Sequence, residues 1–297
     1  MARAPREPRE RLCDEGGRGG FGGFLRSLLA GIPWSESAER VDVEHVKPPR
    51  HVLKIHNSNG KTRVVGEDRD EIEITACKRA RAESHDAAAR LLNEIQILET
   101  PSNGTLELEV VVPRNWKRHG SANVDVRVPR GLRVEVVASN GKILLEGLRS
   151  GVRARSSNGS VHVADVVGDI EVHTSNAKVE CECTCGRLVA RSSNGKIEVQ
   201  QHRGAIDAST SNGMIQAKLD EVGREGVLLA TSNGRIALHL PQEVDAEVDL
   251  HVDNGVIRND RSLARATRDT NGRVRGTLGR GGAPIKLRTS NGSISLR

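Results

Sequence analysis

The sequence predicts an all-β fold, a two-sided parallel β-solenoid of about twelve coils. A Ser-Asn-Gly-like triplet recurs along most of the chain at intervals close to 18 or 21 residues. Between the triplets, apolar and polar residues alternate, which is the pattern of half-buried strands. Aromatic residues make up only 1% of the 297 residues. A flat solenoid about 10 Å thick accommodates small aliphatic side chains better than rings, so the composition agrees with the repeat.

Asparagine marks one corner of each predicted coil. From Asn140 onward the Asn-to-Asn spacings are 18, 18, 18, 18, 21, 21, 17 and 20 residues, and the earlier gaps of 44 and 37 are each about two coils. The second of these gaps holds a degenerate corner, Ser121-Ala122-Asn123. We expect the corner amides to form a stacked ladder with a structural role. The ladder positions are Asn59, Asn103, Asn140, Asn158, Asn176, Asn194, Asn212, Asn233, Asn254, Asn271 and Asn291.

Two short strands are expected in each coil, because inward apolar positions recur every nine residues. The residue two places after each of them is again small or apolar, and the residues between are mostly polar. Each strand therefore buries one side, and successive coils must stack to complete a core. The inward positions are Ile143, Val152, Val161, Ile170, Val179, Leu188, Ile197, Ile206 and Ile215.

The repeated Ser-Asn-Gly-x-Ile corners and the closing segment LRTSNGSISL at 287–296 resemble the bacterial putative-adhesin family of β-strand-repeat proteins, a domain of unknown function. The resemblance covers about residues 40–297. It implies a right-handed β-solenoid that is often linked with the cell envelope. It supplies no catalytic motif.

Residues 1–38 differ in composition from the repeat. The first 20 are rich in Arg, Glu, Pro and Gly, a composition typical of disorder. Residues 21–32 then have the apolar spacing of a short amphipathic helix. We expect this helix to cap the first coil, with peripheral membrane contact or docking to a partner as alternatives. Its apolar stripe is Phe21, Phe24, Leu25, Leu28, Leu29 and Ile32.

The β-solenoid domain is expected over residues 39–297. A short helical insertion is predicted near residues 84–93, with Ser84 as its N-cap. Trp116 follows a proline in a loop and is expected to cover an edge of the core.

Surface carboxylates form the best catalytic candidate. Glu180 and Glu198 are one coil apart, with His162 a coil earlier and Glu182 nearby. A glycosidase would need such a pair inside a cleft that raises the pKa of one carboxyl group. A flat solenoid face provides no cleft, so we interpret these residues as solvated surface charge.

Three cysteines alternate along one expected strand, Cys181, Cys183 and Cys185. They would hold zinc only if all three sulfur atoms shared a face and a fourth ligand were present. Cys181 takes the position of a core residue, and the paired Cys-x-x-Cys spacing is absent. We therefore expect no metal site and no cofactor.

The function predicted from these features is a non-enzymatic scaffold that presents its faces to a protein or envelope component. The alternative is a polysaccharide-active enzyme that uses the surface carboxylates. The scarcity of aromatic residues disfavours nucleic-acid binding. A cytoplasmic location is predicted, with the cell envelope or surface as the alternative.

The last coils are strongly basic. Residues 257–297 carry ten Arg or Lys residues against two Asp residues, whereas the whole chain has a net charge of +6. We expect this charge to meet an acidic partner and, next to an open last strand, to discourage end-to-end stacking.

Overall fold

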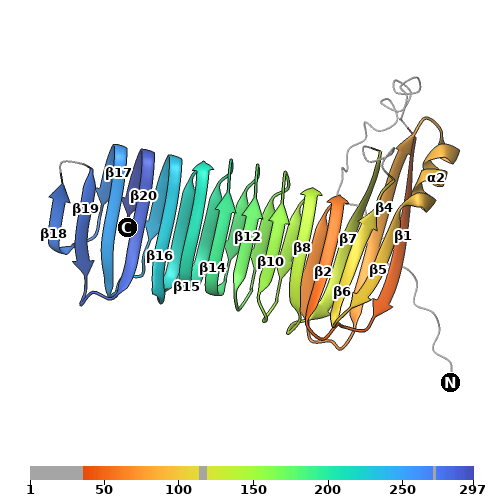
Figure 1. The fold of residues 1–297 in the computed structure, drawn as a ribbon, viewed down its shortest axis with the longest axis horizontal. Coiled ribbons are helices and arrows are strands. Elements are labelled where there is room, and N and C mark those ends of the chain that lie inside the picture. The colour runs from red at the N-terminus through yellow and green to blue at the C-terminus, as the bar shows by residue number, and fades with distance from the viewer. Residues whose placement is uncertain (1–35, 114–118, 270–271) are drawn as a thin grey trace, which may run out of the picture.

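The computed structural model describes residues 36–113, 119–269 and 272–297, and these form an elongated all-β body with one helix (Figure 1). The first third comprises β1 (Glu36–Val46), β2 (Val52–Asn59), β3 (Thr62–Glu67), β4 (Ile72–Ala82), α2 (His85–Glu94), β5 (Gln96–Ser102), β6 (Thr105–Val111) and β7 (Gly120–Pro129). The middle comprises β8 (Arg133–Asn140), β9 (Ile143–Glu146), β10 (Val152–Ser156), β11 (Val161–Ala164), β12 (Ile170–Thr174), β13 (Val179–Glu182), β14 (Cys185–Ser192) and β15 (Ile197–Asn212). The last third comprises β16 (Ile215–His239), β17 (Ala246–Asn259), β18 (Ala264–Asp269), β19 (Arg273–Leu278) and β20 (Ala283–Leu296).

The middle of the body is a regular parallel repeat. β10 pairs with β12 and β11 pairs with β13, each in parallel and each with partners 18 residues apart. Successive strands therefore alternate between two ladders, one on each side of the body. The longer spacing arises in β16, where Ile197 still pairs with Ile215 but Ile206 pairs with Val227, across local register shifts. The extra residues of the 21-residue coil are thus accommodated at these register shifts, away from the Asn corner.

A continuous aliphatic core lies between the two ladders. The nine inward positions predicted from the sequence are all buried, with at most 3% of their surface exposed. The residues two places later, such as Leu145 and Ala190, are also buried, so the predicted nine-residue register is confirmed. This cluster runs from Leu53 to Leu296.

The coils at the first end do not stack in chain order. β2 pairs in parallel with both β6 and β8, and β3 with both β7 and β9. The 81-residue distance between Asn59 and Asn140 therefore separates two adjacent coils, and the interpretation of the gaps as stacked intermediate coils is wrong. The intervening chain forms the end of the body, where β4 is antiparallel to β1 and β7, and β5 is antiparallel to β6.

The other end is also rearranged. β20 lies between β16 and β17 and pairs in parallel with both (Figure 1). The expectation that the last strand leaves an open edge is therefore wrong. The end of the body is instead formed by the antiparallel strands β19 and β18 on one side and by residues 255–259 of β17 on the other.

The helix α2 interrupts the repeat between β4 and β5. The Ser84 side chain accepts a hydrogen bond from the backbone N–H of Ala87 and caps the helix. Leu91 and Leu92 pack with Ala80 of β4. No helix in the described part of the chain is both long and apolar enough to cross a membrane. The predicted helix at 21–32 and Trp116 lie outside the described residues.

Candidate functional site

The most extended surface feature is a ladder of asparagine side chains along one corner of the body. Each Nδ2 group donates to the Oδ1 atom of the neighbouring coil, over 2.9 to 3.1 Å in seven of the eight steps and 3.5 Å between Asn254 and Asn291. In spatial order the ladder is Asn59, Asn140, Asn158, Asn176, Asn194, Asn212, Asn233, Asn291 and Asn254.

One predicted ladder position lies elsewhere. Asn103 has a φ of 47° in the turn of the β5–β6 hairpin, followed by Gly104 with a φ of 78°, so its assignment to the ladder is wrong. Asn-Gly suits such a hairpin turn as well as a solenoid corner, because the hairpin turn requires positive φ and a corner such as Gly159 leaves no room for a Cβ atom. Asn271 lies outside the described residues. Asn123, from the degenerate corner, accepts a hydrogen bond from the backbone N–H of Lys61.

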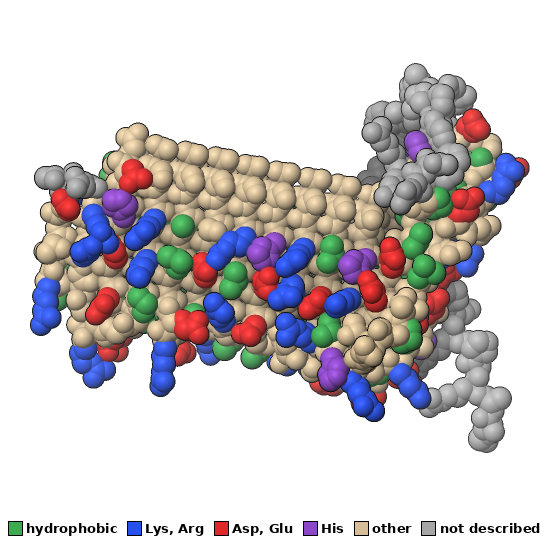
Figure 2. All heavy atoms as spheres, in the orientation of Figure 1, with side chains coloured by type: hydrophobic (Ala, Val, Ile, Leu, Met, Phe, Trp, Pro, Cys, Tyr) green, Lys and Arg blue, Asp and Glu red, His purple; other side chains and the backbone are tan. Residues whose placement is uncertain are grey.

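The corners bring the backbones of adjacent coils into close contact. A Cβ atom added to Gly159 would overlap the carbonyl oxygen of Gly141 in the neighbouring coil. Buried hydroxyl groups satisfy several backbone groups there: Ser156 accepts from the Gly159 N–H at 2.9 Å, and Thr231 donates to the Gly213 carbonyl at 3.2 Å. The corner is thus a tightly packed, uncharged ridge. Figure 2 shows it as a tan band above a face on which charged and hydrophobic side chains mix.

The predicted carboxylate cluster is neutralised by two lysines. Lys178 lies 2.8 Å from Glu180 and 3.0 Å from Glu198, and Lys196 lies 2.8 Å from Glu198. His162 contacts the other side of Glu180 at 3.5 Å. Hydrogen bonds from Lys196 and Lys178 lower the pKa of Glu198 to about 2, and that from Lys178 lowers the pKa of Glu180. Both carboxyl groups therefore stay ionised, the opposite of what a general acid needs.

The lysines were missed in the sequence although a signal was present. Lys178 and Lys196 each precede a glutamate by two residues, a spacing that places both side chains on the same side of a strand. Glu182 also points outward and is partly exposed.

The three cysteines do not converge. Cys181 is fully buried in the core, and burial raises the pKa of its thiol to about 12. Cys183 has a φ of 51°, which breaks the strand alternation, and its Sγ atom donates to Gln201 at 3.1 Å. Among the described residues, no group of three or more His, Cys, Asp or Glu side chains is placed to hold a metal ion.

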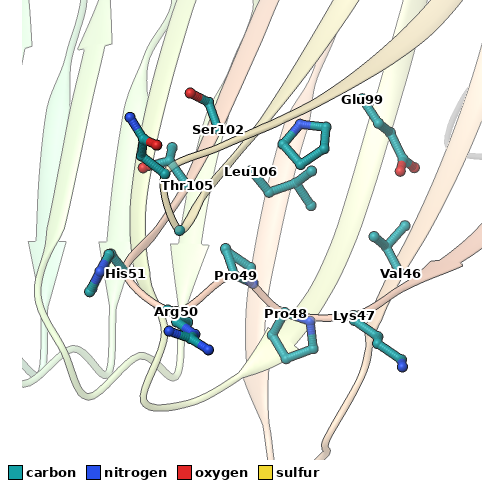
Figure 3. Close-up of a pocket in the computed structure, with 13 residues that line it drawn as sticks. Val46, Lys47, Pro48, Pro49, Arg50, His51, Glu99, Ser102, Thr105 and Leu106 are labelled. Atoms are coloured by element: carbon teal, nitrogen blue, oxygen red, sulfur yellow. The ribbon is translucent and has the colours of Figure 1, made fainter.

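A cavity of about 740 Å³ opens at the first end of the body, between the loop after β1 and the β5–β6 hairpin (Figure 3). Its apolar lining includes Val46, Pro49 and Leu106, and Glu99 lies on its rim. The Glu99 carboxyl group contacts that of Glu44 in β1, and burial together with this neighbour raises the pKa of Glu99. Sequence reasoning missed both glutamates. Each occupies an inward position, where the alternating strand pattern predicts an apolar residue.

A buried histidine was also missed. His202 has no exposed surface, its Nδ1 atom lies 2.9 Å from the Thr184 hydroxyl oxygen, and its Nε2 atom lies 3.3 Å from the Ala205 carbonyl oxygen. The carbonyl can only accept, so Nε2 carries the proton and Nδ1 accepts from the hydroxyl group. Burial lowers the pKa of His202 to about 4.

The chain is similar to known proteins over most of its length. The family model described as Toastrack DUF4097 matches residues 51–297. No curated protein sequence matches. A solved structure of a putative adhesin from Parabacteroides merdae is 13% identical, with 87% of this chain and 96% of that chain covered and a TM-score of 0.47. One from Bacteroides fragilis, also a putative adhesin, is 13% identical, with 90% and 100% covered and a TM-score of 0.44.

Proposed function

The chain belongs to the Toastrack DUF4097 family, and on this premise we propose that it is a non-enzymatic β-solenoid scaffold, an adhesin-like or envelope-associated module for protein interactions. In the same proposal the solenoid is right-handed and has about twelve coils. Its partner is a protein or an envelope component, bound without a cofactor.

The observation that carries the proposal is the regular parallel repeat from β8 to β15. Its outward residues recur every 18 positions at one strand spacing, as in the row Arg153 and Glu171. Such a row presents regularly spaced side chains on a rigid, flat surface, which suits recognition of an extended partner. The ion pairs within the row leave the surface polar without a strong net charge.

The alternative, a polysaccharide-active enzyme, would need a carboxyl group that is protonated near neutral pH beside its substrate. The lysine contacts of Glu180 and Glu198 work against this role. We therefore place the surface carboxylates in the scaffold's charged face.

Two measurements test the proposal. The full chain, immobilised and exposed to an extract of its native cell, should retain a defined partner, and the same chain without residues 1–38 tests whether that segment contributes. In parallel, the chain is incubated with bacterial envelope polysaccharides and the release of reducing ends is measured. Release by the natural chain that is lost in Glu180→Gln/Glu198→Gln would overturn the scaffold proposal in favour of the enzyme.

Location is part of the proposal and is tested separately. We place the protein in the cytoplasm, and fractionation of the native cell with an antibody against the repeat distinguishes this from an envelope or surface location. Recovery in the envelope fraction would reject the cytoplasmic assignment and leave the scaffold proposal intact.

A further inference from the structure

Four strand edges are open at the two ends of the described body. At the first end, β1 pairs only with β4 and β5 pairs only with β6, while α2 packs against Ala38 in the first part of β1 and Arg40 donates to Asn93 of the helix. At the other end, β18 pairs only with β19, and residues 255–259 of β17 pair only with β20. Open edges offer unpaired backbone N–H and C=O groups to another chain unless charge or cover prevents it.

The first end carries acidic groups that point inward. Glu44 lies opposite Ile74, and Glu99 lies opposite Leu108, so both side chains take core-facing positions of end strands. The two carboxyl groups contact one another, and among the described residues no cation pairs with either. Asp42 of β1, by contrast, is already held by Lys78 at 2.6 Å.

The other end carries the opposite charge. Residues 255–278 contain six arginines against two aspartates. Arg268 of β18 lies opposite Val274, whose other neighbour is the buried Leu250, so Arg268 also takes a core-facing position. Within the described part of the chain, neither Arg258 nor Arg268 forms an ion pair.

The strand directions at the two ends allow them to continue one another. β18 runs parallel to β17, and β5 runs opposite to β6, so that β18 placed beside β5 would form an antiparallel pair. On the other side, residues 255–259 placed beside β1 would form a parallel pair, because β1 runs in the same direction as β7. Each of the two ladders would thus continue with a paired strand from the next copy of the chain.

From these observations we propose that the ends bind one another between copies of this chain: the β18 end of one copy docks head to tail on the β1 and β5 end of the next, with Arg268 facing the Glu44 and Glu99 pair. Inward charges keep like ends apart, and their opposite signs make unlike ends attract. Because the two surfaces differ, the contact is heterologous and gives open chains of subunits. The inference goes beyond the proposed function, because it identifies the acidic partner expected for the basic last coils as a second copy of this chain.

The test measures the mass of the full chain by sedimentation velocity as salt is varied. Association should be strongest at about 20 mM salt and should be lost near 1 M, where the screening length falls to about 3 Å. A mass that stays that of one chain at low salt would overturn the proposal. Association that increases with salt would also overturn it.

Charge reversal gives a sharper result. In one variant Glu44 and Glu99 become Lys, and in another Arg258 and Arg268 become Glu. Each variant alone should sediment as a single chain, because both of its ends then have the same sign. An equimolar mixture should form open chains in which the two variants alternate, since every contact between unlike variants brings a basic end against an acidic end. A mixture that stays monomeric would refute the complementary pairing.

Two controls separate this interface from other effects. Changing Arg203, Lys218 and Arg235 to Glu alters three exposed cations that lie in neither end strand and should leave association unchanged. The thermal melts of all variants should match that of the natural chain. If the full chain is monomeric and associates only without residues 1–35, its own first segment occupies the β1 end and the proposal is wrong.

Discussion

The buried His202 makes the stability of the fold sensitive to mild acid. Its neutral ring is held between the Thr184 hydroxyl and the Ala205 carbonyl with no exposed surface. Protonation would place a charge in this site and would turn Nδ1 into a donor, which Thr184 could meet only by reversing its hydroxyl group. The ring of His202 is therefore protonated less readily in the folded protein than in the unfolded chain.

The size of the effect follows from the pKa values. The pKa of His202 is about 4 in the fold, against 6.5 for an ordinary histidine. Between these values the unfolded state binds more protons, so the free energy of unfolding falls as pH falls. At 1.36 kcal/mol for each unit of pKa difference, the full loss is about 3 kcal/mol, of which about 2 kcal/mol falls between pH 6.5 and 4.5. The lowered pKa of Glu198 acts only below about pH 4.5, because an ordinary glutamate ionises above that value.

The assay is urea unfolding followed by circular dichroism at several pH values from 7.0 to 4.5, for the natural chain and for His202→Gln. The variant should be less stable at pH 7 because the Thr184 contact is altered. Its free energy of unfolding should, however, fall by about 2 kcal/mol less than that of the natural chain across this pH range. Equal losses in both proteins would refute the reasoning, as would an NMR titration that places the pKa of His202 near 6.5.

Three further substitutions test the core, the corner and the ladder, each by the midpoint of thermal unfolding. Ile197→Asp should unfold the neighbouring coils because it buries an unpaired charge at a cost of several kcal/mol, whereas the outward Glu182→Lys should change the midpoint little; equal midpoints would contradict the register. Gly159→Ala should destabilise strongly because the added methyl group overlaps the neighbouring backbone, and Gly131→Ala, which has open space, is its control; equal losses would contradict the corner packing. Asn176→Ala removes two exposed ladder hydrogen bonds and should cost about 1 kcal/mol of stability. An unchanged midpoint would show that the ladder does not contribute to stability.

The repeat could be predicted in detail because a strand has a strict two-residue period. A residue such as Ile197 is either inward or outward, and the burial of its 18-residue partner Ile215 follows from the same pattern. The order of the coils could not be predicted in this way, since inward and outward alternation does not specify which strand lies alongside. β20 has the same corner and the same apolar spacing as any other coil, and it fits between β16 and β17 as well as it would fit after them.

The candidate sites were less accessible to sequence reasoning. The ladder positions from Asn140 to Asn233 follow from spacing alone, whereas Asn103 has the same sequence signal in a hairpin. His202 carries no signal, because a polar residue beside a corner glycine is usually exposed. Glu44 and Glu99 break the apolar pattern, and only the end position of their strands explains why the fold tolerates charges there.

The insertion of β20 between β16 and β17 has a consequence for synthesis of the protein. Both flanking strands are synthesised before β20, so the ladder there cannot close in the order in which it is translated. From the end of β17 to the end of β20 the ribosome adds 37 residues, which takes about 2 to 7 s at ordinary elongation rates. During that interval β16 and β17 must either stay apart or pair wrongly and then separate. The nascent chain thus keeps the aliphatic edge of β16 unpaired for seconds, which makes this coil the place where a ribosome-associated chaperone would have most to protect.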